Sequence, residues 1–308
     1  MLDATLERAR TGAVSARGFL RLAAISAAAL FLVVTSGAFV RLTGSGLGCE
    51  NWPRCGDTPF PERGFHAYVE FGNRLVALTG IVLALATWVA ARRVPGLSRG
   101  ARLAALGALA IALAQIPMGG VTIALELHPL AVMTHFLLGM AVLGLAVAVV
   151  VEAWGHAAGR GRPAGPRWLR RAVVSLGLPA CAALVVTGAV ATASGPHPGA
   201  EADVRRLGVE IADTVYVHVR VAAAFGLGVL LVGWLLRAER RRYPGLALLW
   251  GALVAALAAQ AVVGEVQYRN ALPWGLVLVH VVLAAAIWAL ALAFAHALWR
   301  PPASLTRQ

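Results

Sequence analysis

Three histidines, His135, His218 and His280, lie within long apolar stretches of this 308-residue sequence. His218 and His280 are separated by the same number of residues as Asn73 and His135. Ionisable groups are costly inside a membrane helix, so those that occur there are candidates for function. Imidazole is a common ligand of haem iron, and two histidines on facing helices of a four-helix bundle can hold the ring between them. His218 and His280 therefore predict a haem site.

Two other interpretations of these histidines stay open. Their rings could instead bond to neighbouring helices or to water. A proton relay or a transport site also uses isolated histidines. Such a site predicts acidic partners, however, and the sequence places none deep in the apolar stretches of its second half. The chemistry of the residues alone therefore favours haem.

The start of the second apolar stretch carries polar residues at helical spacing. His66, Glu70 and Asn73 share one face of the expected helix. A carboxylate about one turn from a haem pocket can stabilise a cationic intermediate or move a proton. Alternatively, Glu70 only favours the helix start through the dipole and faces water. Arg74 and Arg220 either pair with anionic groups such as haem propionates or extend to the membrane surface.

The other histidines and the cysteines carry weaker signals. Cys49 and Cys55 flank a short loop where an oxidising compartment allows a disulfide, and two free thiols are the alternative. Cys181 stands alone and is expected to be a small buried apolar residue. The remaining candidates are expected to be solvated residues near the membrane surfaces rather than ligands: His128, His156, His197 and His296.

The elements that hold these residues follow from composition. The chain is 59% hydrophobic and only 13% charged, which excludes an ordinary soluble globule. A membrane-spanning helix needs roughly 20 mostly apolar residues. About eight such stretches are predicted: 19–41, 67–91, 101–123, 130–153, 168–193, 213–237, 244–265 and 273–298.

The formal net charge of +13 is explained by topology rather than by nucleic acid. The arginines are not gathered in one basic domain with interleaved aromatic residues; they fall in every second connection. By the positive-inside rule these connections and both termini are cytoplasmic. The connections 42–66, 124–129, 194–212 and 266–272 are then outside, so we expect a multi-pass protein of the cell membrane.

The chain repeats itself. One constant offset carries Gln115 onto Gln260, Gly119 onto Gly264 and His135 onto His280. An even number of helices in each half gives both halves the same orientation. We therefore predict an all-α membrane protein of eight transmembrane helices, built as two tandem four-helix bundles in parallel duplication. The expected segments are a cytoplasmic N-terminal segment 1–18, a first half 19–153, a cytoplasmic linker 154–167, a second half 168–298 and a cytoplasmic tail 299–308.

These residues resemble a known family. The run Thr35-Ser36-Gly37-Ala38-Phe39-Val40-Arg41-Leu42-Thr43-Gly44-Ser45-Gly46-Leu47-Gly48-Cys49, followed by Trp52-Pro53-x-Cys55 and a helix with Glu70 and Arg74, is similar to the haem A synthases. The resemblance covers nearly all of the chain. It implies two four-helix halves and an oxidoreductase that converts a methyl group of haem O to a formyl group, giving haem A for terminal oxidases.

The resemblance also implies roles for single residues. His218 and His280 would hold a haem B cofactor that passes electrons, and Glu70 would act on the substrate haem O in the first half. Cys49 and Cys55 would form a disulfide on the outside.

Two departures from the family pattern stand out. The family commonly has a histidine where this chain has Asn73, and an amide is a poor ligand of iron. Either His66 and His135 share the substrate iron, which we favour, or His135 binds it alone. His66 stands about 10 Å from Asn73 along the helix axis. The connection 194–212 also lacks a cysteine pair, so a redox role of a second disulfide is absent.

The expected partners are haem O, membrane lipid and, by family resemblance, a haem O synthase and assembly factors of cytochrome oxidase. Two alternatives of different class remain. One is a membrane b-type cytochrome that only carries electrons, and the other is a haem transport or insertion protein.

Overall fold

The computed structural model describes residues 13–49, 51–57, 60–61, 64–200 and 204–306. Within these residues eight helices are long and apolar enough to cross a membrane, which confirms the predicted all-α membrane architecture. Seven of them are α2 (Ala16–Leu42), α3 (Phe65–Arg93), α4 (Arg99–Ala124), α5 (Pro129–Ala158), α8 (Ile211–Leu235), α9 (Pro244–Arg269) and α10 (Trp274–Trp299). The remaining span, Arg167–Ser194, consists of α6 (Arg167–Ala172), the π-helical turn η1 (Val173–Gly177) and α7 (Leu178–Ser194).

The helices extend beyond the apolar runs because polar residues stabilise their ends. Ser15 and Ser98 cap α2 and α4, each accepting a backbone N–H bond at 3.1 Å. At the far end of α9, Glu265 pairs with Arg269 one turn later, at 2.5 Å, and the helix continues to that arginine. The expected boundaries, read from hydrophobicity alone, therefore fall a few residues short at several helix ends.

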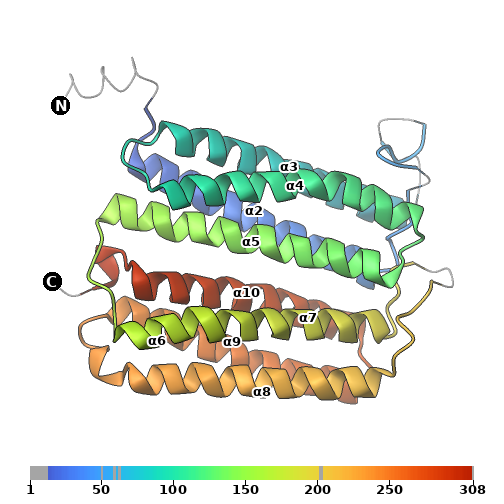
Figure 1. The fold of residues 1–308 in the computed structure, drawn as a ribbon. Coiled ribbons are helices and arrows are strands. Elements are labelled where there is room, and N and C mark those ends of the chain that lie inside the picture. Colours follow the sequence, from blue (N-terminus) through green and yellow to red (C-terminus); the bar gives the residue numbers. More distant parts are fainter. Residues whose placement is uncertain (1–12, 50, 58–59, 62–63, 201–203, 307–308) are drawn as a thin grey trace.

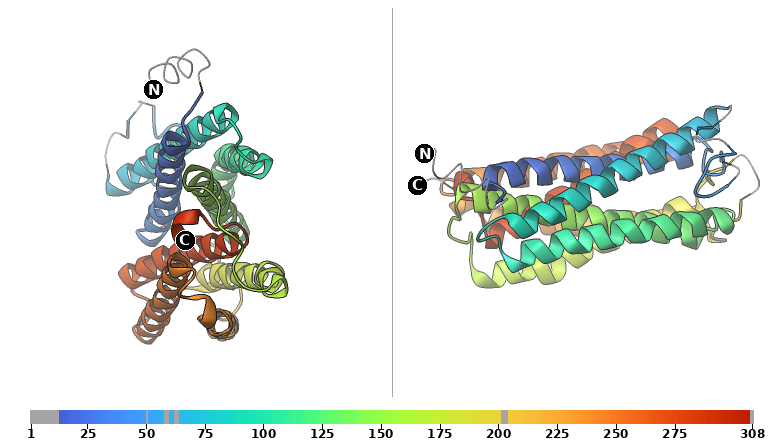
Figure 2. Two further views of the ribbon diagram at one scale, coloured as in Figure 1. Left: turned by 90° about the vertical axis from the view of Figure 1, so that its left-hand side faces the viewer. Right: turned by 90° about the horizontal axis from the view of Figure 1, so that it is seen from above.

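The helices form two groups that lie side by side (Figure 1). Helices α2 and α5 face α7 and α10 in the middle of the molecule, where α10 packs against both α2 and α5. Helices α3 and α4 cover one flank, and α8 and α9 cover the other (Figures 1 and 2). The described ends of the chain lie at the same end of the molecule, together with the arginine-rich connections α3–α4, α5–α6 and α8–α9.

Close packing joins the two groups at mid-height. Trp288 of α10 donates its indole N–H to the backbone carbonyl of Met140 in α5 at 2.8 Å. A Cβ at Gly144 would lie 2.9 Å from Leu292 and 3.1 Å from Trp288, so α5 and α10 approach closely only because Gly144 has no side chain. This close packing therefore fixes the position of α5, which carries His135, relative to α10, which carries His280.

A buried carboxylate joins the two groups at the end that carries the termini. Glu152 of α5 is 3% exposed and accepts bonds from Ser98 at 2.7 Å and from Arg160 at 2.6 Å. His296 and Arg300 approach the same carboxylate from α10 and its C-terminal end, at 2.7 and 3.2 Å. His296 is therefore a half-buried partner of Glu152 rather than a solvated surface residue. Sequence analysis did not single out Glu152.

The connections at the opposite end are also bonded across the groups. The N–H of Gly46 donates to the carbonyl of Gly199 at 2.7 Å. Arg41, at the end of α2, donates to the carbonyls of Thr192 and His197 at 3.1 Å. The His197 ring in turn lies 2.7 Å from the carbonyl of Leu272, so this histidine is bonded within the connections instead of facing bulk water. The helix ends near the predicted site are thereby fixed relative to one another.

Candidate functional site

The structure brings His218 of α8 and His280 of α10 together. Their ring centroids lie 6.3 Å apart, with 60° between the ring planes. Both rings are largely shielded from solvent. Nδ1 of His218 is hydrogen-bonded to the hydroxyl of Thr187 on α7 at 3.0 Å, and Gln260 of α9 donates to the backbone carbonyl of His280 at 3.1 Å. All four helices of this group therefore contribute to the position of the two imidazoles.

Two glycines make room for the rings. A Cβ at Gly188 would lie 3.0 Å from Cε1 of His218, and one at Gly264 would lie 3.2 Å from Cε1 of His280. Any larger residue at either position would press on an imidazole. The space that the two imidazoles occupy therefore depends on these two glycines having no side chain.

The distances suit two imidazoles bound to one metal ion. A metal–imidazole bond is about 2 Å long, and the ring centre lies about 1 Å further on, so two rings that bind one metal ion can have centres about 6 Å apart. The observed 6.3 Å agrees with this. Nδ1 of His280 is also buried without a hydrogen-bond partner among the described residues. Helices α8 and α9 contact each other much less closely than α3 and α4 do. The residues present thus fit a haem between His218 and His280.

The other group of helices repeats several of these contacts. Ser36 of α2 donates to Oδ1 of Asn73 on α3 at 2.7 Å, where Thr187 and His218 stand in the second group. Gln115 donates to the carbonyl of His135 at 2.9 Å, as Gln260 does to that of His280. Nδ1 of His135 is likewise buried without a hydrogen-bond partner in the part of the chain that the structure describes.

His66 lies at the start of α3 and faces the connection from α2. Its Nδ1 is 2.9 Å from the hydroxyl of Ser45, which is fully buried. In both His66 and His218, Nδ1 is thus bonded to a hydroxyl, an arrangement that orients the ring. Asn73 is held by Ser36, two turns further into the helix.

Glu70 does not face water, because it is only 5% exposed. One carboxylate oxygen accepts the backbone N–H of Cys49 at 2.9 Å, and the other binds Arg74 at 2.6 Å. The interpretation of Glu70 as a solvated helix-start residue is therefore wrong. One oxygen thus joins α3 to the loop that precedes it, and the other pairs with Arg74 within the same helix.

Arg74 holds this loop from the other side. Its Nη1 donates to the carbonyls of Pro53 and Arg54 at 3.0 and 2.7 Å, and its guanidinium lies 4.8 Å from the ring centre of Trp52. Arg74 therefore turns back onto the loop instead of extending to the membrane surface. Arg220 differs, since it is exposed and lies over the ring of Tyr216.

The loop is closed by a disulfide between Cys49 and Cys55, as predicted. Cys181 is a buried free cysteine, also as predicted. Within the disulfide loop, Trp52 lies against two glycines of α4. A Cβ at Gly120 would lie 2.8 Å from its indole nitrogen, and one at Gly119 would lie 3.8 Å from Cε1 of His135. Trp52 was not singled out as a site residue, and the only signal for it was its place beside Pro53 between the cysteines.

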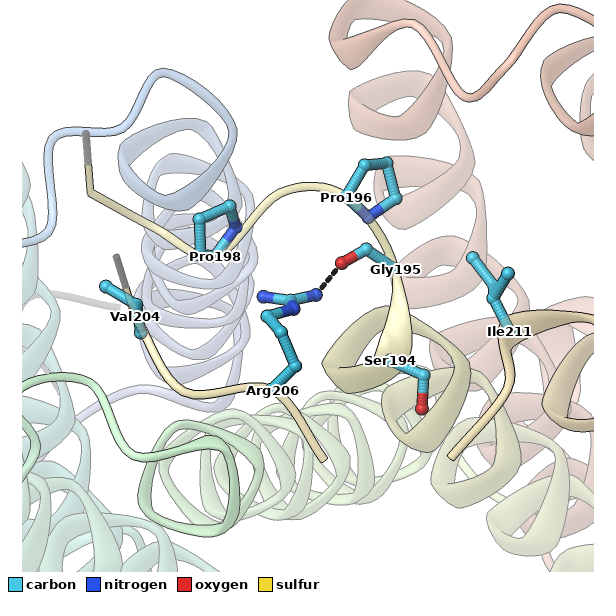
Figure 3. A pocket seen from close by; sticks show the side chains of 7 residues that line it. All are labelled: Ser194, Gly195, Pro196, Pro198, Val204, Arg206 and Ile211. Carbon is cyan, nitrogen blue, oxygen red and sulfur yellow. Dashed lines mark hydrogen bonds between the residues drawn. The ribbon is translucent and has the colours of Figure 1, made fainter. Parts of the chain in front are cut away.

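A cavity of about 440 Å³ lies between the end of α7 and the start of α8 (Figure 3). It is lined by Ser194, Gly195, Pro196, Pro198, Val204, Arg206 and Ile211. The Arg206 guanidinium crosses it, donating to the carbonyls of Gly195 and Thr192. Burial lowers the pKa of Arg206. These bonds give Arg206, which sequence analysis did not single out, a structural role beside α7.

The fold and the site define a multi-pass helical membrane protein with histidines set between its helices near one membrane surface. The chain belongs to the COX15-CtaA family, described as cytochrome oxidase assembly protein, whose family model matches residues 20–292.

Segments of the chain are also similar to curated proteins named heme A synthase. The protein of Geobacillus kaustophilus (strain HTA426) is 32% identical over 114 residues, which are 34% of this chain and 33% of that protein. The protein of Symbiobacterium thermophilum is 37% identical over 92 residues, 29% of each chain. The protein of Bacillus licheniformis is 40% identical over 67 residues, 21% of this chain and 22% of that protein. The matched segments thus span at most about a third of the length of these relatives.

Proposed function

We propose that this protein is a haem A synthase, an oxidoreductase that converts a methyl group of haem O to a formyl group and so provides haem A for terminal oxidases. The proposal rests on the observation that the sites in the two groups of helices contain different residues. One has a histidine pair at a spacing suited to a resident metal group, and the other has His135 on α5 and a buried carboxylate, Glu70, on α3. The family membership and the names of the relatives support the same activity.

The second half, 168–298, would hold the cofactor, haem B, between His218 and His280. When bound, this group supplies one-electron transfer. The chain's own contribution is to fix the ligands: Thr187 orients the His218 ring, and the glycines at positions 188 and 264 leave room for the two imidazoles.

The first half, 19–153, would bind haem O as substrate. His135 offers its ring from α5, and His66, whose Nδ1 is bonded to the hydroxyl of Ser45, is the second ligand that we favour. Asn73 keeps its bond to Ser36 and does not bind iron. Arg74 holds the loop over this site through Pro53 and Arg54. The alternative is that His135 binds the iron alone.

Glu70 is the residue we assign to the chemistry. With water as the source of oxygen, the change from methyl to formyl adds one oxygen atom and releases four protons and four electrons by atom balance. One-electron acceptors reached through the second-half site would take the electrons. Glu70, fixed by the N–H of Cys49 and by Arg74, would accept a proton or stabilise positive charge beside the reacting carbon.

The arginine-rich end of the molecule would face the cytoplasm, together with both termini, by the positive-inside rule. The disulfide loop and both histidine sites then lie near the outer surface of the cell membrane. A haem O synthase and assembly factors of cytochrome oxidase are the partners that this function requires.

The test is co-expression with a source of haem O, followed by extraction and chromatography of the haems. Haem A or its alcohol precursor is expected with the native chain. Haem B alone would favour a b-type cytochrome that only carries electrons, and a purified protein without any haem band would favour a transport or insertion protein. Pyridine haemochrome spectra of His280→Ala and His135→Ala then separate the sites: the first should lose the resident haem, and the second should keep it but form no haem A. His128→Ala, in the connection before α5, is the control.

A further inference from the structure

A second cavity, of about 450 Å³, lies at the end of the molecule that carries the termini. Its lining comes from the linker, from α6 and from the α8–α9 connection: Arg162, Pro163, Gly165, Arg170, Glu239, Arg242 and Tyr243. This volume is in the range of sites that bind small ligands. It is far from the histidine sites, and the proposed function makes no use of it.

The cavity is built from fixed parts. Tyr243 is buried and donates its hydroxyl to the carbonyl of Pro163 at 3.3 Å. Arg170 donates to the carbonyl of Gly165 at 2.7 Å and stacks on the ring of Trp299 at 5.0 Å. Gly165 has a φ of +67°, a conformation that favours glycine, so the turn beside Arg170 is also defined by sequence.

The charge of the cavity is unbalanced. It has three arginines and one carboxylate, Glu239, and in the described part of the chain none of these arginines forms an ion pair with it or with another acid. Arg162 and Arg242 donate no side-chain hydrogen bond to any described residue. Three guanidinium groups with donors to spare are a receptor for a phosphate-type anion.

The surroundings place this cavity where a membrane surface meets water. Trp168 and Trp234, which are 59% and 56% exposed, stand at the helix ends next to it, and such residues gather at the headgroup level. Leu248, one turn into α9, is 75% exposed and presents an apolar surface near the start of that helix. An anion bound here would therefore have acyl chains beside it.

We propose that this cavity binds the phosphate of an anionic phospholipid headgroup, with Arg162 and Arg242 as its main contacts and the acyl chains along the start of α9. The bound lipid adds a link between the linker and the α8–α9 connection, two segments that also share the Tyr243–Pro163 bond. Basic pockets between helices at a cytoplasmic surface are suited to such headgroups.

The test uses the full chain, purified in detergent and stripped of lipid, titrated with phosphatidylglycerol, phosphatidylcholine or inorganic phosphate at constant ionic strength. Retained lipid is measured by native mass spectrometry, and the unfolding temperature is measured in parallel. We expect phosphatidylglycerol to bind and to raise the unfolding temperature, and the other two to do neither. An equal effect of phosphatidylcholine would contradict a charge-based site, and an equal effect of inorganic phosphate would assign the site to a free anion.

The variants test the residues. Arg162→Gln with Arg242→Gln should weaken phosphatidylglycerol binding about 25-fold, about fivefold for each arginine removed. Arg93→Gln with Arg99→Gln removes two exposed arginines at the same end but outside the cavity, and it should bind as the native chain does. If the first pair does not fold, Arg162→Gln alone should still weaken binding about fivefold. Equal binding by the cavity variants and the control pair would overturn the proposal.

Discussion

The carboxylate of Glu70 accepts a hydrogen bond from the backbone N–H of Cys49 at 2.9 Å, which ties the residue assigned to the chemistry to one end of the disulfide loop. The other carboxylate oxygen binds Arg74, and Arg74 binds the carbonyls in the middle of the same loop. Helix α3 and the loop are therefore one unit, and a change in either is expected to move Glu70.

Removing the charge of Glu70 should stop the reaction without unfolding the chain. Glu70→Gln keeps an oxygen that can accept the Cys49 N–H but cannot take up a proton as a carboxylate does. Formation of haem A should fall by about 10²-fold or more, the range typical for loss of a general base. The measurement is haem A formed in a defined assay, with the spectrum of the resident haem as a control for folding. Undiminished conversion would remove Glu70 from the mechanism.

Opening the disulfide should displace Glu70 rather than remove it. In Cys49→Ser with Cys55→Ser the N–H of residue 49 is still present but is held less firmly. We expect haem A formation to fall about tenfold, because misplacing a reacting group by a fraction of an ångström has effects of this order. Haem bound at the second site should not change. Full activity in the absence of the disulfide would show that the loop holds its position through Arg74 and Trp52 alone.

Restoring a histidine at position 73 tests the difference between the halves. Asn73 stands where His218 stands in the second half, and Ser36 is placed to bond its ring as Thr187 bonds that of His218. Asn73→His should therefore let the first half bind haem B more tightly, by about tenfold or more, when haemin is titrated and the low-spin absorption band is followed. An unchanged titration would mean that residue 73 does not face the iron of the first site.

The two glycines that make room for the imidazoles, Gly188 and Gly264, allow a prediction that another glycine of the same group of helices controls. Gly188→Ala places a methyl group 3.0 Å from the His218 ring and should cost about 1–3 kcal/mol in stability, with loss of resident haem. Gly226→Ala, in the middle of α8, meets no atom within 4 Å. It should keep the haem and should not lower the unfolding temperature, since alanine favours helix. The comparison is made by pyridine haemochrome content per protein.

The membrane-spanning helices and the histidine pair could be predicted, because both follow from the composition of the sequence and from regular spacings in it. Long apolar runs predicted the eight spans, and the equal spacing of paired polar residues placed His218 opposite His280. Two features could not be predicted. Trp52 reaches Gly119 and Gly120 from a loop without regular structure, and Glu152 gathers partners from three separate segments. Such contacts depend on how helices and loops meet in three dimensions, and no local pattern encodes them.

The contacts of Glu152 determine whether the chain could be cut into two fragments that fold independently. Its carboxylate belongs to the first group of helices, but His296 and Arg300, two of its four partners, come from the last helix and its end. A fragment that stops in the linker would keep Ser98 and Arg160 and leave the buried acid short of positive charge, while the complementary fragment would carry unmatched cations. Neither half of the chain is therefore self-sufficient, because a buried acid of the first group is neutralised in part by cations that the last helix supplies.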